Sequence, residues 1–437
     1  MNHVTCIVLA GGEGKRFWPL SNNKVLFPFF GKPLFDFSVR DVLPKEIDNI
    51  VIVASPGTKE YYEKISLPVK HAVVVQEQSL GMADAVLKTK DSVAAHTPLL
   101  IVIADDVSDV SLYTDLLKTV EKSQAFGVMP GWKADRYYDF GYLVLDDDRV
   151  TAIKEKPGEG NEPSSYVYIG GQYISDSSIL FEELEKTKSE NDDVFEKALS
   201  SLMQTHEFIM HPYAGADATL KFPWNVLEVM DQLFLRLKSH RGKNVVIRSN
   251  VVIEGDVYID DDVKIFENTK IVGPAYIGRG SIIGNNNMIR QSHIGDGCVT
   301  GFNTDITRSY IGDGCWFHMN YIGDSVLEGD ITLGGGAMLA NLRLDDGKIA
   351  SLVKGEKCNT EKNKLGSIIG TGVRIGANTT IMPGVKIGKD SLISSGIVID
   401  RDIPNSSFVK GVTNYTIVAN KNTPSPLSRD EFKKKLV

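Results

Sequence analysis

The sequence predicts an α/β, Rossmann-like domain followed by a left-handed parallel β-helix built from hexapeptide repeats. Two observations lead to this prediction. Up to about residue 240, short apolar runs alternate with segments of helical period, and beyond that point isoleucines recur at every sixth residue. We therefore expect domains at 1–240 and 241–415, followed by a tail at 416–437 that has no period.

Four short runs in the first half are predicted to be buried strands. They are rich in Val and Ile, flanked by polar or turn residues, and lie at 6–10, 50–54, 72–75 and 99–104. Intervening segments such as 81–92 suit helices. Alternating strand and helix predicts a mainly parallel sheet that is covered on both faces. One amphipathic helix is expected over 223–238, before the polar break at 240–244 that ends the domain.

The second half is defined by isoleucines six residues apart, with Gly, Asn and Asp between them. Each hexad would form one flat face with its Ile in the core, and Gly or Asn would allow the tight corner. The register slips around Ile294 and Ile311, and residues 334–365 interrupt it, so an excursion from the helix is expected there. The regular positions are Ile247, Ile253, Ile259, Ile265, Ile271, Ile277, Ile283, Ile289, Ile369, Ile375, Ile381, Ile387, Ile393 and Ile399.

Composition and charge exclude several classes of function. The 437 residues carry a net charge of −8, so no nucleic acid held by a general basic field is expected. The only dense basic run, 433–435, is predicted to be a solvated tail. No apolar stretch approaches the ~18 residues of a membrane span, and the N-terminus lacks a basic leader. The four cysteines form no C-x-x-C pair, so we expect a cytoplasmic protein with reduced thiols.

A glycine-rich loop directly follows the first predicted strand. Gly11, Gly12 and Gly14 would let the backbone approach a ligand and direct N–H groups at phosphate oxygens. Arg16 adds a forked charge that suits phosphate, and Lys24 is close enough in sequence to reach the same site. A tight strand-to-helix turn is the alternative interpretation of such a loop.

This loop opens a longer pattern that resembles the sugar-nucleotide pyrophosphorylase family. LAGGxGxRxxPL at 9–20 matches the family signature, and KVLFPFFGKP at 24–33 is similar to its second motif. The resemblance implies that Arg16 and Lys24 are catalytic and neutralise a nucleoside triphosphate, which the loop glycines bind. The family usually has Pro before the lysine, where this chain has Asn23.

Later motifs extend the resemblance to the base and the metal. In QEQSLGMADA, Gln76 would read the nucleobase edge and Gly81 would let the base pack on backbone. Asp105, which follows Ala104 where the family commonly has Gly, would bind Mg²⁺. Asp217 is the best match for a second metal carboxylate, although two extra residues follow it and the usual preceding Trp is missing.

The resemblance also implies a sugar-phosphate site. Gly141 and Gly171 match glycines that line the sugar, Glu155 would accept hydrogen bonds from its hydroxyls, and Lys156 would hold its phosphate. The implied reaction is attack by a sugar 1-phosphate oxygen on the α-phosphorus of UTP or dTTP, with loss of pyrophosphate. Positioning and cationic stabilisation supply such catalysis without a covalent nucleophile.

One stretch of the predicted β-helix resembles the acetyltransferase site of archaeal-type bifunctional members of the family. It begins at His318 in HMNYIGDS and continues to NLRLDD, which ends at Asp346. On this resemblance His318 is the general base that takes a proton from the substrate ammonium, because imidazole exchanges protons near neutral pH. Tyr321 and Asn341 would hold the amino sugar or its phosphate.

The same resemblance implies a groove for acetyl-CoA between subunits. Backbone around Gly335, Ala377 and Ser395 would line it. Met319, Gly335 and Ala337 depart from the Lys, Ala and Thr that are common in the family, so fewer polar contacts to the substrate phosphate are expected.

Three interpretations of the chain follow. The leading one combines amino-sugar-1-phosphate N-acetylation with nucleotidyl transfer and yields a UDP-N-acetylhexosamine. The second is a single-activity pyrophosphorylase whose β-helix only oligomerises. The third is a regulatory subunit with a decayed site, which Asn23, Ala104 and the shifted Asp217 favour. Left-handed hexapeptide helices commonly stack as trimers, so a homo-oligomer of one or two trimers is expected. No motif separates UTP from dTTP, or glucosamine from galactosamine.

Overall fold

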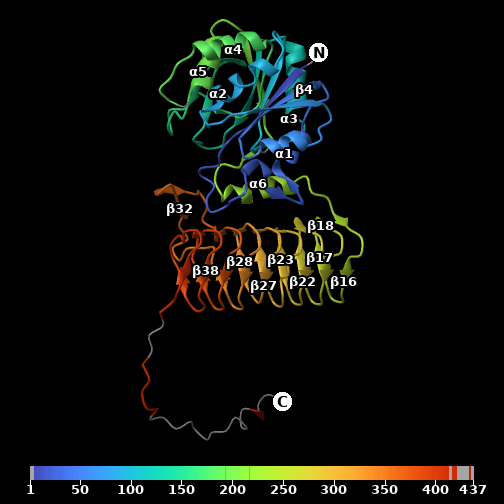
Figure 1. Cartoon of the computed structure of the whole chain (residues 1–437), viewed down its shortest axis with the longest axis vertical. Helices are drawn as coiled ribbons and strands as arrows, with labels where there is room; N and C mark the ends of the chain where they lie inside the picture. The colour runs from blue at the N-terminus through green and yellow to red at the C-terminus, as the bar shows by residue number, and fades with distance from the viewer. Residues whose placement is uncertain (1–3, 192, 216, 413–415, 421–432, 435–437) are drawn as a thin grey trace.

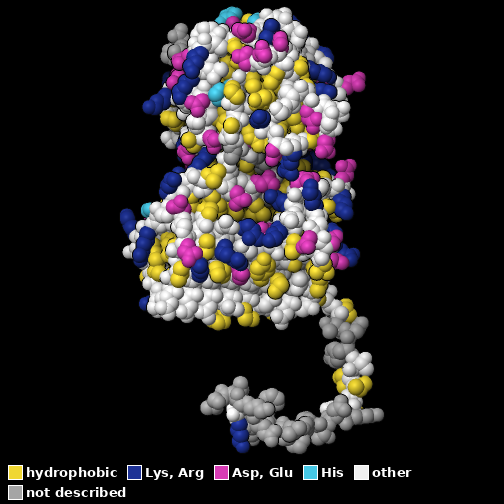
Figure 2. Space-filling view, turned by 180° about the vertical axis from the view of Figure 1, so that it is seen from behind, with side chains coloured by type: hydrophobic (Ala, Val, Ile, Leu, Met, Phe, Trp, Pro, Cys, Tyr) yellow, Lys and Arg dark blue, Asp and Glu magenta, His cyan; other side chains and the backbone are white. Residues whose placement is uncertain are grey.

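An α/β domain stands on the flank of a parallel β-helix, and helix α6 (Asn225–Phe234) lies at their junction (Figure 1). From behind, the two parts meet at a waist, and hydrophobic side chains lie among charged ones along the β-helix (Figure 2). Among the described residues, no helix is long and apolar enough to cross a membrane. The tail expected at 416–437 lies largely outside the described residues. The computed structural model describes residues 4–191, 193–215, 217–412, 416–420 and 433–434.

The four predicted strands are confirmed and form one side of a ten-stranded sheet. They are β1 (Val4–Ala10), β4 (Ile47–Ala54), β5 (Lys70–Val75) and β6 (Leu99–Ile103), and they are parallel in the order β6-β1-β4-β5. The carboxyl ends of β1 and β6 therefore open at the same edge. The other strands continue the sheet as β11 (Tyr166–Tyr168), β9 (Gly141–Asp146), β10 (Arg149–Glu155), β13 (Phe208–Tyr213), β8 (Gly127–Lys133) and β12 (Gln172–Ile174).

The prediction of a mainly parallel sheet is wrong for this second side. β12 runs antiparallel to β6, and β10 runs antiparallel to β9. The connection between β9 and β10 is only the pair Asp147 and Asp148, and Asp147 adopts a left-handed φ of 53°. Such a short turn joins only antiparallel neighbours, because a parallel pair needs a crossover of a dozen residues or more.

Helices cover both faces of the sheet, as predicted. α1 (Lys59–Lys64) and α3 (Leu112–Ser123) pack on one face. α2 (Met82–Leu87), α4 (Ser177–Lys186) and α5 (Val194–Leu202) pack on the other. The helix expected over 81–92 is α2 followed by a 3₁₀ turn, and the one expected over 223–238 is the shorter α6. The remaining short elements are 3₁₀ turns at Lys24–Leu26 and Lys90–Ser92, a π-helical turn at Asp36–Arg40, and strands β2 (Pro28–Phe29), β3 (Lys32–Pro33), β7 (Asp106–Val107) and β14 (Ala218–Thr219).

The isoleucine repeat forms the core of the β-helix. Ile265 pairs with Ile283 and Ile271 with Ile289, and all four side chains are buried in one continuous column. Three parallel sheets form its three faces. The first face comprises β15 (His240–Arg241), β18 (Val257–Ile259), β21 (Ala275–Ile277), β24 (His293–Ile294), β26 (Tyr310–Ile311), β29 (Val326–Leu327), β34 (Ile368–Ile369) and β37 (Lys386–Ile387).

The two other faces follow the same coils. The second face comprises β16 (Val246–Ile247), β19 (Lys264–Ile265), β22 (Ile282–Ile283), β27 (Trp316–Phe317), β30 (Thr332–Leu333), β35 (Arg374–Ile375), β38 (Leu392–Ile393) and β40 (Phe408–Val409). The third face comprises β17 (Val252–Glu254), β20 (Lys270–Val272), β23 (Met288–Arg290), β25 (Asp305–Thr307), β28 (Tyr321–Gly323), β31 (Met338–Leu339), β36 (Thr380–Ile381) and β39 (Val398–Ile399).

The predicted register slips correspond to coils that contain fewer residues. The excursion from the coil also covers fewer residues than predicted. One coil spans 18 residues from Ile271 to Ile289 but only 16 from Ile306 to Ile322, while the pairing stays in register. Residues 334–339 remain in the coil, because Met338 on β31 pairs on both sides. The chain leaves only afterwards, forms the hairpin β32 (Ala350–Val353) and β33 (Glu356–Asn359), and returns at β34.

Aromatic side chains on the first face join the two parts of the chain. The rings of Tyr276, His293 and Tyr310 stack with centroids 5.0 and 4.5 Å apart. The backbone N–H of Phe30 donates to His293 Nε2 at 3.1 Å, so Nδ1 carries the proton that His293 donates to the Ile311 carbonyl at 2.9 Å. The Tyr310 hydroxyl donates to the Pro28 carbonyl at 2.7 Å. The segment after Lys24 is therefore fixed to the β-helix.

This arrangement predicts an acid-sensitive junction. Burial lowers the pKa of His293 to about 4, whereas an unfolded histidine titrates near 6.5. The stability due to neutral His293 is thus fully present above pH 6.5 and is lost as the pH falls, by roughly 3 kcal/mol at pH 4. Urea unfolding of wild type and His293→Gln at pH 7 and pH 4.5 measures this, and the difference between the two proteins should shrink at the lower pH. The exposed His240→Gln serves as control, and a pH-independent difference for His293→Gln would contradict the prediction.

Candidate functional site

A cavity of about 300 Å³ opens where β1 and β6 end, the usual ligand position in an open α/β sheet. Six of the residues predicted from the sequence line it, namely Arg16, Lys24, Asp105, Gly141, Glu155 and Asp217. They come from segments up to 200 residues apart. The fold therefore brings together the predicted cations, carboxylates and sugar-side residues.

The glycine-rich loop has open space at Gly12 and is fixed at its end. A Cβ on Gly12 would meet no atom within 4 Å, and Gly14 has a left-handed φ of 64°. The Asn23 carboxamide accepts the Val25 N–H at 3.0 Å and so begins the 3₁₀ turn that carries Lys24. Asn23, the departure from the family pattern, thus supplies a cap for this turn. Lys24 forms an ion pair with Asp105 at the cavity wall.

The carboxylates of the cavity repel one another. β14 pairs with β7, and this pairing places Thr219 opposite Asp106 and brings Asp217 close to Asp106. Burial, then the charges of Asp217 and Asp105, hold the pKa of Asp106 well above its usual range. Burial and the charge of Asp109 raise the pKa of Asp217 to about 7. Asp106 directly follows Asp105 in the sequence, but no role was predicted for it.

A third cation, Lys221, was also missed by the sequence analysis. It lines the same cavity, with Nζ 5.1 Å from the ring centre of Phe140 and 5.8 Å from that of Phe222. Burial, then the nearby Arg16 guanidinium, lowers the pKa of Lys221. Only the fold reveals this position, because no motif singled out Lys221.

Of the two glycines predicted to line the sugar, Gly141 borders the cavity and Gly171 does not. A Cβ on Gly141 would lie 2.9 Å from Glu155 Oε2, so a larger residue here would displace this carboxylate from its present position. The prediction named Gly171, but Gly170 lines the cavity. Gly171 has a φ of 109° and packs against Tyr113, where a Cβ would approach the ring to 2.5 Å.

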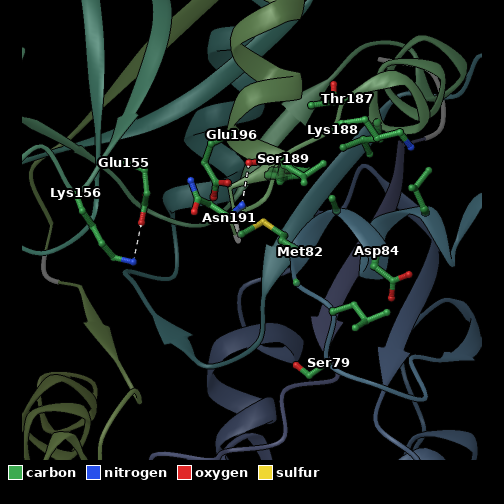
Figure 3. A pocket seen from close by; sticks show the side chains of 17 residues that line it. Ser79, Met82, Asp84, Glu155, Lys156, Thr187, Lys188, Ser189, Asn191 and Glu196 are labelled. Atoms are coloured by element: carbon green, nitrogen blue, oxygen red, sulfur yellow. Dashed lines mark hydrogen bonds and ion pairs between the residues drawn. The ribbon is translucent and has the colours of Figure 1, made fainter. Parts of the chain in front are cut away.

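A larger cavity of about 810 Å³ adjoins the first and shares Met82, Glu155 and Glu196 with it. Figure 3 shows Glu155 and Lys156 on one side of it and Met82 and Asp84 on another. Lys156 Nζ lies 3.3 Å from Glu155 Oε1. Lys156 lines the larger cavity, whereas Glu155 lines both cavities. The two cavities together offer room for a nucleotide and a sugar.

Gly81 borders this larger cavity, and Gln76 lies behind it without lining the cavity. Gly81 has a φ of 93°. Gln76 is buried, and its Nε2 donates to the Gly81 carbonyl at 3.1 Å and to the Asp84 carboxylate at 2.9 Å. Both amide hydrogens are thus used within the protein, so a contact between this amide and a base would require one of these bonds to be exchanged.

The predicted acetyltransferase residues fall into two corners of the β-helix. His318 is exposed in the corner between the second and third faces. Gly335, Ala377 and Ser395 occupy the same corner in the following coils, where Asn378 N–H donates to the Gly335 carbonyl at 3.0 Å. The His318 corner therefore joins the general-base candidate with the predicted acetyl-CoA backbone.

A buried asparagine fixes the His318 corner. Asn320 accepts the His318 N–H at 2.6 Å and donates to the Gly334 and Ala337 carbonyls, each at 2.9 Å. These bonds link two coils and hold Met319 in a left-handed conformation with φ 55°. Asn320 thus fixes the backbone of this corner, and the sequence motif contained it without singling it out.

Tyr321 and Asn341 meet across Gly323 on the third face. A Cβ on Gly323 would lie 2.6 Å from both Tyr321 Oη and Asn341 Nδ2, so these two polar groups face the same space. Asn341 donates to Asp324, which also accepts two hydrogen bonds from Arg308, at 2.7 and 2.8 Å. A groove of about 370 Å³ beside Tyr321 is lined by Met319 and Met338.

Comparisons with known proteins agree with this division of the chain. Residues 5–217 match the family model described as nucleotidyl transferase, and residues 367–401 match that of the hexapeptide repeat of succinyl-transferase. Together with the three-faced coil, they confirm the predicted α/β domain followed by a left-handed parallel β-helix.

Three curated relatives align along most of the chain. The bifunctional sugar-1-phosphate nucleotidylyltransferase/acetyltransferase of Sulfurisphaera tokodaii is 32% identical over 391 residues, which cover 87% of this chain and 93% of that protein. The bifunctional protein GlmU of Methanococcus vannielii is 28% identical, and that of Methanocaldococcus jannaschii is 29% identical. Each of these two alignments covers 93% of this chain and 97% of the relative.

Proposed function

Because the chain belongs to the family of bifunctional sugar-1-phosphate nucleotidylyltransferase/acetyltransferases, we propose that it carries out both reactions. It transfers a nucleoside monophosphate from UTP or dTTP to a sugar 1-phosphate and releases pyrophosphate. It also N-acetylates glucosamine or galactosamine 1-phosphate with acetyl-CoA, and the final product is a UDP-N-acetylhexosamine. The observation that carries the proposal is the single cavity that gathers Arg16, Lys24 and Glu155 with three aspartates.

Nucleotidyl transfer in this cavity depends on how the side chains position the substrates and neutralise their charge. Arg16, Lys24 and Lys221 neutralise the triphosphate, and Lys24 exchanges its ion pair with Asp105 for phosphate oxygens when the nucleotide binds. The sugar phosphate oxygen forms the new bond to the α-phosphorus as the bond to pyrophosphate breaks. Glu155 orients the sugar, so the two polyanions meet in line.

The carboxylates fit a Mg²⁺ ion. Asp105 and Asp217, with Asp106 beside them, offer hard oxygen donors, and a divalent cation would relieve the repulsion that raises the pKa of Asp106. The described residues hold no group of three or more His, Cys, Asp or Glu that could bind a metal. Mg²⁺ commonly takes one or two protein carboxylates and completes its shell with water and substrate phosphates, so Asp105 and Asp217 would suffice as its protein ligands. When bound, the ion would stabilise charge on the phosphoryl oxygens.

The cations of the cavity can be tested by pyrophosphate release. Arg16→Ala should lower kcat about 100-fold or more, and Lys221→Met about tenfold, because each removes charge aimed at the transition state. Lys15→Ala is the matched control, since this neighbour is exposed and its ion-pair partner among the described residues is Glu13. Wild-type turnover in Arg16→Ala would overturn the assignment of the site.

Acetyl transfer is assigned to the His318 corner. The substrate amine attacks the thioester carbonyl of acetyl-CoA, so a C–N bond forms, the C–S bond breaks, and the CoA thiol leaves. His318 takes the proton from the ammonium nitrogen, and Asn320 holds the backbone of His318 for this role. Tyr321 and Asn341 bind the sugar phosphate, and the backbone of Gly335, Ala377 and Ser395 lines the acetyl-CoA groove.

Thiol release from acetyl-CoA tests this second activity. With glucosamine 1-phosphate or galactosamine 1-phosphate, His318→Ala should lose about 100-fold of the rate, while pyrophosphate release stays unchanged. His240→Ala, an exposed histidine on the first face, is the control and should retain both activities. If His318→Ala released thiol at the wild-type rate, the β-helix would remain a scaffold and the chain a single-activity pyrophosphorylase.

We also propose a trimer that acts in the cytoplasm. Large apolar side chains are exposed on the second face at Trp316, Leu392 and Phe408, and on the third at Val398. Such side chains, rimmed by polar ones, are typical of contacts between subunits. All four cysteines are free, which fits a reducing compartment.

A further inference from the structure

The loop between Arg16 and Lys24 is bound by a carboxylate of the β-helix. Glu328, at the end of β29, is 5% exposed. Its Oε1 accepts the Ser21 N–H at 2.7 Å, the Ser21 hydroxyl at 2.9 Å and the Asn22 N–H at 2.8 Å. Its Oε2 accepts the Thr371 N–H of the next coil at 2.9 Å. One oxygen therefore holds the loop while the other is fixed to the β-helix.

The neighbouring contacts bring the same loop close to the coil. Trp18 Nε1 donates to Asn405 Oδ1 at 3.0 Å, and the Lys386 ammonium lies 4.9 Å from the Trp18 ring centre. A Cβ on Gly370 would lie only 2.7 Å from the Pro19 carbonyl oxygen. Glu328 is the acidic member of this contact, and it binds the two residues that directly precede the Asn23 cap of the Lys24 turn.

The chemistry of these bonds favours a positional role over a stabilising one. Ser21 and Asn22 are exposed residues, so water would satisfy their N–H groups if Glu328 were absent. Removing a carboxylate from water is costly, and among the described residues no lysine or arginine forms an ion pair with Glu328. These hydrogen bonds fix the position of the backbone between Arg16 and Lys24, two cations of the cavity.

We propose that Glu328 is a positioning residue for nucleotidyl transfer, through which the β-helix sets the spacing of Arg16 and Lys24. This inference rests on the proposed function and deepens it, because it makes the second domain part of the first reaction. An error of about 1 Å in placing a reacting group can cost 10²-fold in rate. The β-helix is therefore required for full activity of the α/β domain, whatever its own chemistry.

The test compares Glu328→Ala, Glu328→Gln and Asp330→Asn in the full-length chain, with pyrophosphate release and thiol release measured on the same preparations. Glu328→Ala should lower kcat/KM for the nucleoside triphosphate about tenfold or more and raise the KM for this substrate. The KM for the sugar phosphate and the rate of thiol release should stay within about twofold of wild type. Glu328→Gln should lose less, since its single oxygen can still accept from the loop. Asp330→Asn should match wild type, because Asp330 is exposed and pairs with Arg374 of the same β-helix.

Three outcomes decide the matter. Wild type that releases no pyrophosphate would overturn the proposed function and this inference with it. Active wild type together with Glu328→Ala of normal kcat/KM would overturn the inference alone. Equal losses of both activities in Glu328→Ala and Glu328→Gln, with an unchanged KM for the nucleotide, would also overturn it, because they would indicate general unfolding. If Glu328→Ala does not fold, the KM values of Glu328→Gln carry the test.

Discussion

The structure depends on the first face of the β-helix, which packs on both of its sides. Its isoleucines fill the coil, as on every face, but its outward side chains at Tyr276, His293 and Tyr310 are buried against the α/β domain. A strand points successive side chains to opposite sides, so one short strand can serve both surfaces. The segment that carries Lys24 continues onto this aromatic surface. The positions of the cavity residues are thus fixed by the rigid coil as well as by the sheet.

The cavity itself places like charges together. Lys221 lies beside Arg16, and Asp106 lies beside Asp217. The pKa of Lys221 is lowered and those of Asp106 and Asp217 are raised, so the neutral form of each of these three buried groups is favoured. Such an arrangement is unfavourable in the protein alone. It would suit the nucleotide phosphates and the Mg²⁺ ion that we propose for this site, the phosphates at the cations and the metal at the carboxylates. The ion pair of Lys24 with Asp105 partly offsets the imbalance.

Sequence periodicity predicted the parts of the fold that local rules control. The isoleucines predicted the coil, because each hexad packs against another of the same pattern. The Val- and Ile-rich runs predicted β1, β4, β5 and β6. The antiparallel side of the sheet was missed because the direction of a strand depends on its connections, such as the turn at Asp147. In the site, motifs located the cations and carboxylates. They missed Lys221 and Glu328, whose partners lie far away in sequence and become neighbours only through the fold.

The different locations of the His318 corner and the α/β cavity have a consequence for flux. The His318 corner lies between the second and third faces, whereas the α/β domain covers the first. If acetyl transfer takes place at that corner, as we propose, the acetylated sugar phosphate would have to leave one side of the coil and reach a cavity on another. Its steady-state concentration, and hence the balance between the two rates, would then depend on diffusion and on competing enzymes.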